Sequence, residues 1–120
     1  MTYNPGQIFD EVEQGAQRLE KAADAYYEAV REYEEAENDF ERELTKQIIA
    51  IVHESKQAGE KRPPAEDIRK AMALERIPQE VYTRYLTAKA NREALKVRYD
   101  ALKAAVSARQ SLLKALGGLG

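Results

Sequence analysis

Apolar residues recur at steps of three and four along most of the chain. The first row comprises Val12, Ala16, Leu19, Ala23, Tyr26, Val30, Tyr33, Phe40, Leu44 and Ile51. The second row comprises Leu95, Tyr99, Leu102, Val106, Leu113 and Leu116. Charged residues fill most positions between them, as in amphipathic helices sustained over several heptads. No segment alternates in the manner of a half-buried strand. The pattern therefore predicts an all-α fold.

Capping and turn residues set the limits of these helices. Asn4 and Pro5 suit a helix start, and Gly59 suits a left-handed C-cap. Pro64 and Pro78 suit the first positions of two later helices. The expected segments are a first helix over 5–58, a tip over 59–77 with a short helix over 64–76, a last helix over 78–116 and a flexible tail over 117–120. We expect one domain, 1–120, folded as an antiparallel helical hairpin or coiled coil.

Three charged residues interrupt the apolar rows: Glu37 in the first, and Arg92 and Arg109 in the second. An antiparallel alignment that places Glu37 opposite Arg92 also pairs Tyr99 with Val30 and Tyr85 with Leu44. A half-buried charge at a seam lowers stability but disfavours slipped alignments. We therefore interpret Glu37, Arg92 and Arg109 as register-setting residues. The alternative interpretation of the arginines is a basic patch for phosphate.

Composition agrees with long helices and one domain: the chain has 120 residues, 33% of them charged, and no cysteine. The absence of cysteine excludes disulfides and thiolate metal sites and fits an intracellular protein. The longest apolar run, IIAIV, is far shorter than the roughly 20 residues of a membrane span. The N-terminus lacks a signal-peptide pattern. We expect a cytoplasmic protein without membrane association.

Charge is unevenly distributed along the sequence. Residues 1–46 hold thirteen acidic and five basic side chains, whereas residues 83–120 hold eight basic and two acidic ones. Two oppositely charged helices that pack on each other would produce this distribution. A basic segment of this kind is also found in nucleic-acid-binding arms.

Side chains suited to catalysis are scarce. His53 is the only histidine, and there is no cysteine to act as a nucleophile. The acidic run over 32–43 contains no Glu-x-x-His pair of the kind that di-iron bundles use. No glycine-rich phosphate loop occurs. The sequence therefore predicts a protein that is not an enzyme and uses no metal or cofactor.

Two hypotheses for function remain. In the first, the chain is a non-catalytic module that binds a protein partner through the tip and through the exposed acids Glu34, Glu35 and Asp39, which could mimic a phosphate backbone. A row of small residues on the last helix would favour a homodimer in the form of a four-helix bundle. That row comprises Ala90, Ala94, Ala101, Ala104, Ala105, Ala108 and Ala115.

In the second hypothesis, the chain binds DNA directly. The tip and its flanks form three helical segments in the size range of a helix-turn-helix domain, although the usual turn glycine is absent. The basic last helix would add contacts to phosphate. The candidate contact residues are Lys61, Arg62, Arg69, Lys70, Arg76 and Arg84.

The segment 85–116, YLTAKANREALKVRYDALKAAVSARQSLLKAL, is a charged helix that ends in Ser-x-x-x-Ser-Leu-Leu. It resembles small helical proteins that bacteriophages encode near genes for single-strand annealing and recombination. This resemblance implies an accessory or inhibitor protein that acts on a protein partner in DNA metabolism or host defence. It covers about a quarter of the chain and implies no functional residues.

Overall fold

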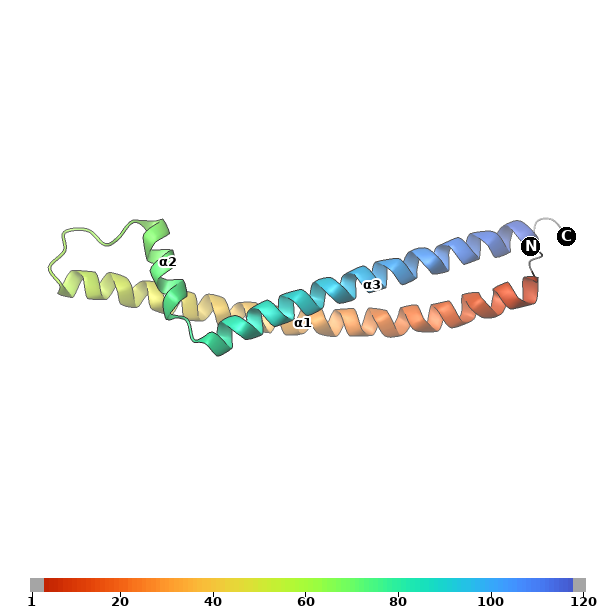
Figure 1. Cartoon of the computed structure of the whole chain (residues 1–120), viewed down its shortest axis with the longest axis horizontal. Coiled ribbons are helices and arrows are strands. Elements are labelled where there is room, and N and C mark those ends of the chain that lie inside the picture. The colour runs from red at the N-terminus through yellow and green to blue at the C-terminus, as the bar shows by residue number, and fades with distance from the viewer. Residues whose placement is uncertain (1–3, 118–120) are drawn as a thin grey trace. The chain divides into compact units, whose positions relative to one another are not determined.

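The computed structural model describes residues 4–117 and contains three helices and no strand in that range (Figure 1). The helices are α1 (Pro5–Gln57), α2 (Glu66–Arg76) and α3 (Gln79–Gly117). The all-α prediction is confirmed, and each predicted helix limit lies within two residues of the observed one. Of the tail predicted over 117–120, residues 118–120 lie outside the described residues.

The chain divides into two compact units, and each long helix contributes to both. The described part of unit 1 combines residues 4–30 of α1 with residues 90–117 of α3. Unit 2 is continuous in sequence and spans residues 31–89, so it contains α2.

Both ends of α1 carry the predicted caps. The side-chain Oδ1 of Asn4 accepts a hydrogen bond of 2.9 Å from the backbone N–H two residues later, which is the usual N-cap bond. At the other end, Gly59 has φ +78°. The N–H of Gly59 donates to the carbonyl of Lys56, and the N–H of Glu60 donates to the carbonyl of Ser55. These two bonds form a Schellman motif, which is why a glycine ends the helix here.

The tip helix begins later than predicted, whereas α3 begins close to the predicted residue. Ala65 is extended, with φ −55° and ψ 153°, so α2 starts two residues after Pro64. Ile77 is extended as well, as expected for a residue before a proline, and this ends α2. Pro78 precedes α3, and its carbonyl accepts a 3.0 Å hydrogen bond from the N–H of Val81. Pro78 therefore starts the last helix from the N-cap position.

In unit 1, the first part of α1 packs antiparallel against the last part of α3 (Figure 1). Tyr26 stacks on Tyr99, with ring centroids 5.9 Å apart and planes within 5°. A buried or half-buried line on α1 repeats every seven positions through Ile8, Gly15, Ala22 and Ala29. A Cβ atom on Gly15 would lie only 3.0 Å from Cγ2 of Val106. The glycine therefore permits a close approach of the two helices.

Unit 2 contains the main aromatic cluster. Tyr33, Ala36 and Ala88 are buried together, and Tyr85 packs against them. Phe40 stacks on Tyr85 with ring centroids 4.5 Å apart. Ala36, only 1% exposed, continues the seven-residue line of small side chains along α1. A small residue at this position leaves room for the rings on either side of it.

The short helix α2 lies against the last part of α1 within unit 2 (Figure 1). Ala73 is completely buried, and Ile77 and Ile51 are nearly so. Arg76 of α2 forms an ion pair with Glu54 of α1. The tip is therefore a packed part of unit 2.

The predicted register between the helices is wrong by at least one helical turn. Tyr99 stacks on Tyr26, four residues before the predicted Val30. Tyr85 stacks on Phe40, four residues before the predicted Leu44. In each unit the stacking of two rings, which favours contact at short centroid distances, replaces the predicted pairing of a ring with an aliphatic side chain.

The predicted inner face of α1 is also partly wrong. The large residues were assigned correctly, but the small residues that complete the buried face lie one position earlier than expected. Ala22 and Ala29 are buried, whereas Ala16 is exposed. The same displacement places Ala36 in the core and leaves Glu37 half-buried. Glu37 is thus half-buried, as are Val30 and Phe40 of the predicted row.

We expect Ala29→Leu to lower the free energy of unfolding by about 1–3 kcal/mol, because a larger side chain overpacks the contact between α1 and α3. Ala16→Leu makes the same change at an exposed position of α1 and should shift the free energy of unfolding by less than about 0.5 kcal/mol. Urea denaturation followed by circular dichroism measures both. A greater loss from Ala16→Leu would show that the originally predicted face is the buried one.

Candidate functional site

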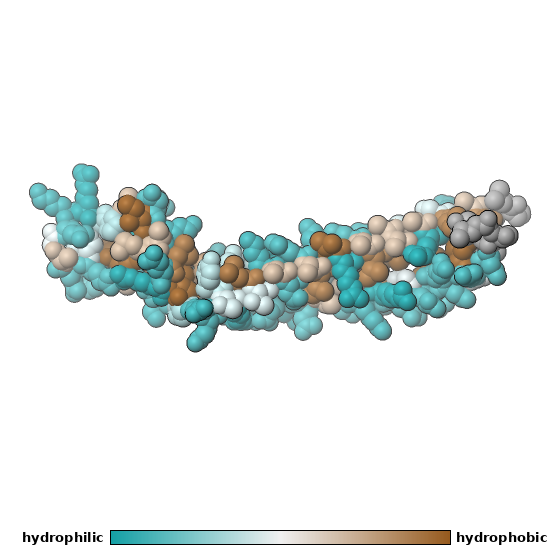
Figure 2. All heavy atoms as spheres, in the orientation of Figure 1, coloured by the Kyte–Doolittle hydropathy of each residue, from teal (hydrophilic) through white to brown (hydrophobic). Residues whose placement is uncertain are grey.

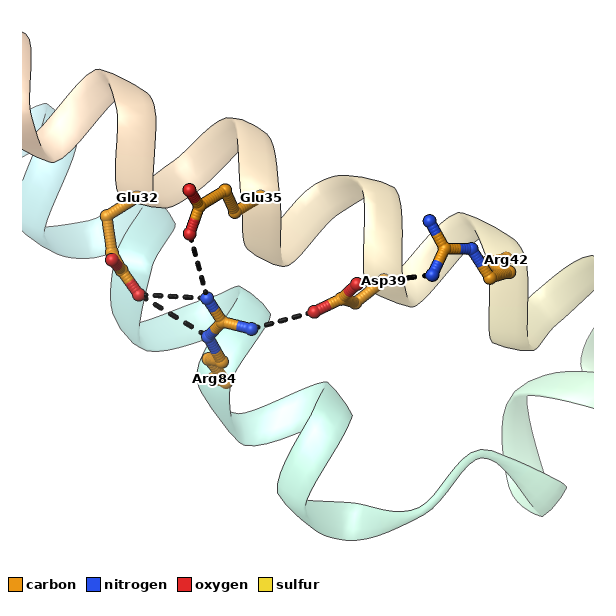
Figure 3. Close-up of polar contacts among 5 residues, drawn as sticks. All are labelled: Glu32, Glu35, Asp39, Arg42 and Arg84. Carbon is orange, nitrogen blue, oxygen red and sulfur yellow. Dashed lines mark hydrogen bonds and ion pairs between the residues drawn. The ribbon is translucent and has the colours of Figure 1, made fainter.

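A cluster of ion pairs surrounds the guanidinium of Arg84, near the start of α3 (Figure 3). Its Nη1 lies 2.7 Å from Oδ2 of Asp39. Its Nη2 lies 3.1 Å from Oε1 of Glu32 and 3.5 Å from Oε2 of Glu35. All three acids project from one side of α1 toward the arginine. We call these four residues the Arg84 cluster.

Electrostatically, the Arg84 cluster is a group of three acids held by one base. The Glu32 carboxylate contacts two nitrogens of Arg84, and this hydrogen bonding raises the pKa of the guanidinium, with Asp39 acting in the same direction. The Arg84 side chain remains 43% exposed, so water screens each pair. A small hollow of about 150 Å³ beside the cluster is lined by Ala36, Asp39, Glu80, Val81 and Arg84. The cluster fixes the start of α3 on α1.

The acids predicted to bind a partner are therefore not equivalent. Glu35 and Asp39 belong to the Arg84 cluster, whereas Glu34 is exposed outside it. A partner that reads Glu35 and Asp39 as phosphate mimics would compete with Arg84 for them.

The bases predicted to contact DNA differ in their surroundings: some are paired with acids, one is half-buried and the others are exposed. Arg76 donates two hydrogen bonds, of 2.9 and 2.8 Å, to the two oxygens of Glu54, and these bonds lower the pKa of the Glu54 carboxyl. Arg84 belongs to its own cluster. Arg69 is half-buried, and its Nε is buried without a hydrogen-bond partner among residues 4–117. Three further bases are exposed: Lys61 and Arg62 in the loop and Lys70 on α2.

The residues interpreted as register-setting have separate environments. Arg109 Nε lies 3.3 Å from Oε2 of Glu11 in unit 1. Glu37 hydrogen-bonds the hydroxyl of Tyr33 in unit 2 and raises the pKa of that hydroxyl. Arg92 is half-buried in unit 1. Arg109 therefore joins α3 to α1 through an exposed ion pair, and its role in alignment remains a prediction.

The outer side of α3 in unit 1 carries a second apolar row, visible in Figure 2 as a tan and brown band along this helix. We call it the α3 outer face, and it consists of Ala90, Ala94, Val97, Ala101, Ala104 and Ala108, all exposed. Val97 is 70% exposed. The sequence prediction missed Val97 because it selected small residues, although the spacing of three and four would have included it. Ala105, which it did include, is half-buried beside α1.

Within residues 4–117, no group of three or more histidine, cysteine or acidic side chains could hold a metal ion. No helix in this part of the chain is long and apolar enough to cross a membrane. Comparisons of the chain with protein-family models, with curated protein sequences and with solved structures found no match. A proposal for function therefore rests on the surfaces of the described residues.

Replacing Arg84 by Gln should lower the midpoint of thermal unfolding, because the charges of Glu32, Glu35 and Asp39 then repel one another without a counter-charge. The control is Arg42→Gln, since Arg42 is 80% exposed and lies 3.9 Å from Asp39. We expect the midpoint of this control to match that of the original chain. The loss caused by Arg84→Gln should shrink in about 1 M salt. Equal midpoints for both variants would contradict a stabilising role for the cluster.

The pair of Glu54 and Arg76 predicts an acid-dependent contribution to stability. Because Arg76 lowers the pKa of Glu54 from its ordinary 4.5 in the folded chain, the pair stabilises the fold above that pH and loses its effect as the pH falls through the lowered value. Glu54→Gln should therefore unfold at a lower temperature than the original chain at pH 7. The two should converge in acid. A difference that is independent of pH would exclude this ion pair as its source.

Proposed function

We propose that this chain is a non-catalytic protein-interaction module that binds another helix along the α3 outer face. The observation that supports this is the exposure of six apolar side chains at coiled-coil spacing on a helix whose opposite side already packs on α1. Rows of this spacing are the surfaces on which helices pair. A small-residue row allows a second helix to approach closely.

The simplest occupant is the α3 outer face of a second copy. A helix pair exposes much surface, and two such pairs that meet along α3 would form a four-helix bundle around a shared core. The resemblance of residues 85–116 to phage-encoded helical proteins suggests the biological setting of this proposed module. In that context the module is a phage-type accessory or inhibitor that acts on a protein of DNA metabolism or host defence.

Direct DNA binding through the tip receives less support. It requires Arg69, Lys70, Arg76 and Arg84 to be available together, but Arg76 and Arg84 are engaged by acids of α1. Phosphate contacts would have to displace those carboxylates.

Self-association is tested by light scattering after size-exclusion chromatography. We expect a dimer for the original chain and a monomer for Ala101→Glu, which places a charge in the centre of the α3 outer face. Gln110→Glu also introduces an acid on α3 and is exposed, but lies off this face, so it should remain dimeric. A monomeric original chain, or equal behaviour of the two variants, would exclude a dimer through this face.

The two functional hypotheses are separated by fluorescence anisotropy with short single- and double-stranded DNA at low and moderate salt. A protein-interaction module should show no binding that depends steeply on salt. Tight binding that weakens steeply as salt rises would indicate that phosphate contacts release counterions. That result would favour direct DNA binding.

A further inference from the structure

A hollow of about 250 Å³ in unit 1 has a basic rim and an apolar floor, and we call it the basic hollow. Its rim consists of Arg18 and Lys21 from α1 and Arg98 from α3, and its floor of Ala22, Ala25 and Leu95. It uses none of the residues of the α3 outer face. It therefore offers a surface that the proposed helix pairing does not require.

The charges around the basic hollow depart from the pattern seen elsewhere between α1 and α3. Within unit 1, Arg109 meets Glu11, and within unit 2, Arg84 meets three acids. Arg98 instead shares its hollow with two further bases, Arg18 and Lys21. In the described part of the chain, none of these three forms an ion pair or a side-chain hydrogen bond. Like charges that share one hollow repel each other, which lowers stability unless an anion joins them.

The apolar floor favours a protein ligand over a bare phosphate. A phosphate group would satisfy the bases but gain nothing from covering Ala22, Ala25 and Leu95. A cavity of about 150 Å³ can hold a benzene molecule, so the basic hollow has room for one large apolar side chain. An adjoining hollow of about 230 Å³ shares Arg18, but its lining also includes Glu11, Gln14 and Arg109 beside Leu102 and Val106. The apolar contacts of a bound segment are therefore expected at the basic hollow.

We propose that the basic hollow binds an acidic amphipathic helix of a protein partner. Its carboxylates would contact Arg18, Lys21 and Arg98, and an apolar side chain would cover the floor. This is the helix-in-groove mode of peptide recognition. The opposite charges would also speed the encounter and select against basic partners.

The test uses a synthetic, dye-labelled helical peptide with leucines along one face and glutamates on both flanks, titrated with the full chain by fluorescence anisotropy. Binding should weaken by about tenfold with Arg98→Glu, a loss of about 1.4 kcal/mol. Arg31→Glu makes the same charge change at an exposed arginine outside the hollow and should retain the affinity. Equal losses would mean that net charge alone attracts the peptide, and no binding to the original chain would overturn the proposal.

A second readout separates this role from a structural one. Arg98→Glu places an acid beside Arg18 and Lys21, so it should raise the midpoint of thermal unfolding while it weakens peptide binding. The gain should be larger at low salt. A structurally required arginine would show the opposite change, which would contradict the proposal.

Two further comparisons test the apolar floor and the class of partner. Ala25→Leu fills the hollow without changing its charge and should weaken binding of the peptide. A peptide with serines in place of the leucines should bind more weakly than the parent. If it binds equally well, or if a short single-stranded DNA binds and the peptide does not, the ligand is a polyanion and the proposal fails. The α3 outer face remains intact in every variant, so the dimer test is independent of this one.

Discussion

Close contact between α1 and α3 depends on small side chains at every seventh position of α1. In unit 1 these positions hold Gly15, Ala22 and Ala29, and in unit 2 the next is Ala36. A glycine inside a helix destabilises it by about 1 kcal/mol relative to alanine. At Gly15 this cost is offset because Val106 occupies the space that a Cβ would need. Rings from the neighbouring seven-residue line, such as Tyr26 and Phe40, then stack on rings of α3.

Part of the uneven charge of the sequence is used in ion pairs within the molecule. Within each unit, an arginine of α3 crosses to acids of α1: Arg109 to Glu11, and Arg84 to the acids of its cluster. Each exposed ion pair of this kind contributes little to the stability of the fold. Together, however, the pairs determine which acids and bases remain available to a partner. Surface charge predicted from the sequence alone is therefore overestimated at both helices. The surfaces left for a partner include the apolar row on α3 and the three bases that share the basic hollow.

Much of the fold follows from local chemistry that the sequence displays. The caps at Asn4 and Gly59 and the breaks at the prolines give the helix limits, because they depend only on neighbouring residues. The inner face of α1 was harder to assign, since alanines flank the large residues on both sides. Ala22 and Ala23 suit helix periodicity equally well, and only the packing partner distinguishes them.

The candidate site could not be predicted for a related reason. The sequence predicts that Arg84 contacts DNA and that Glu35 and Asp39 contact a protein partner, although both acids bind Arg84. Their types and exposure were visible in the sequence, but their proximity depends on the register between α1 and α3. The observed register brings two rings together in each unit, a pairing that residue spacing does not specify.

Val97 and Arg98 are consecutive on α3, and neither side chain favours the stability of unit 1 when no partner is bound. Exposed alanines are good helix formers and need no partner to be tolerated. Val97 is different, because a β-branched residue has lower helix propensity than alanine and this one, 70% exposed, buries little of its side chain. Arg98 shares the basic hollow with two other bases and has no acid partner among the described residues. Selection for stability alone would favour neither residue, whereas binding would use both, the first by burial and the second by neutralisation. Their adjacency places the two proposed surfaces side by side on one helix, so that a second copy and an acidic helix could each occupy one of them.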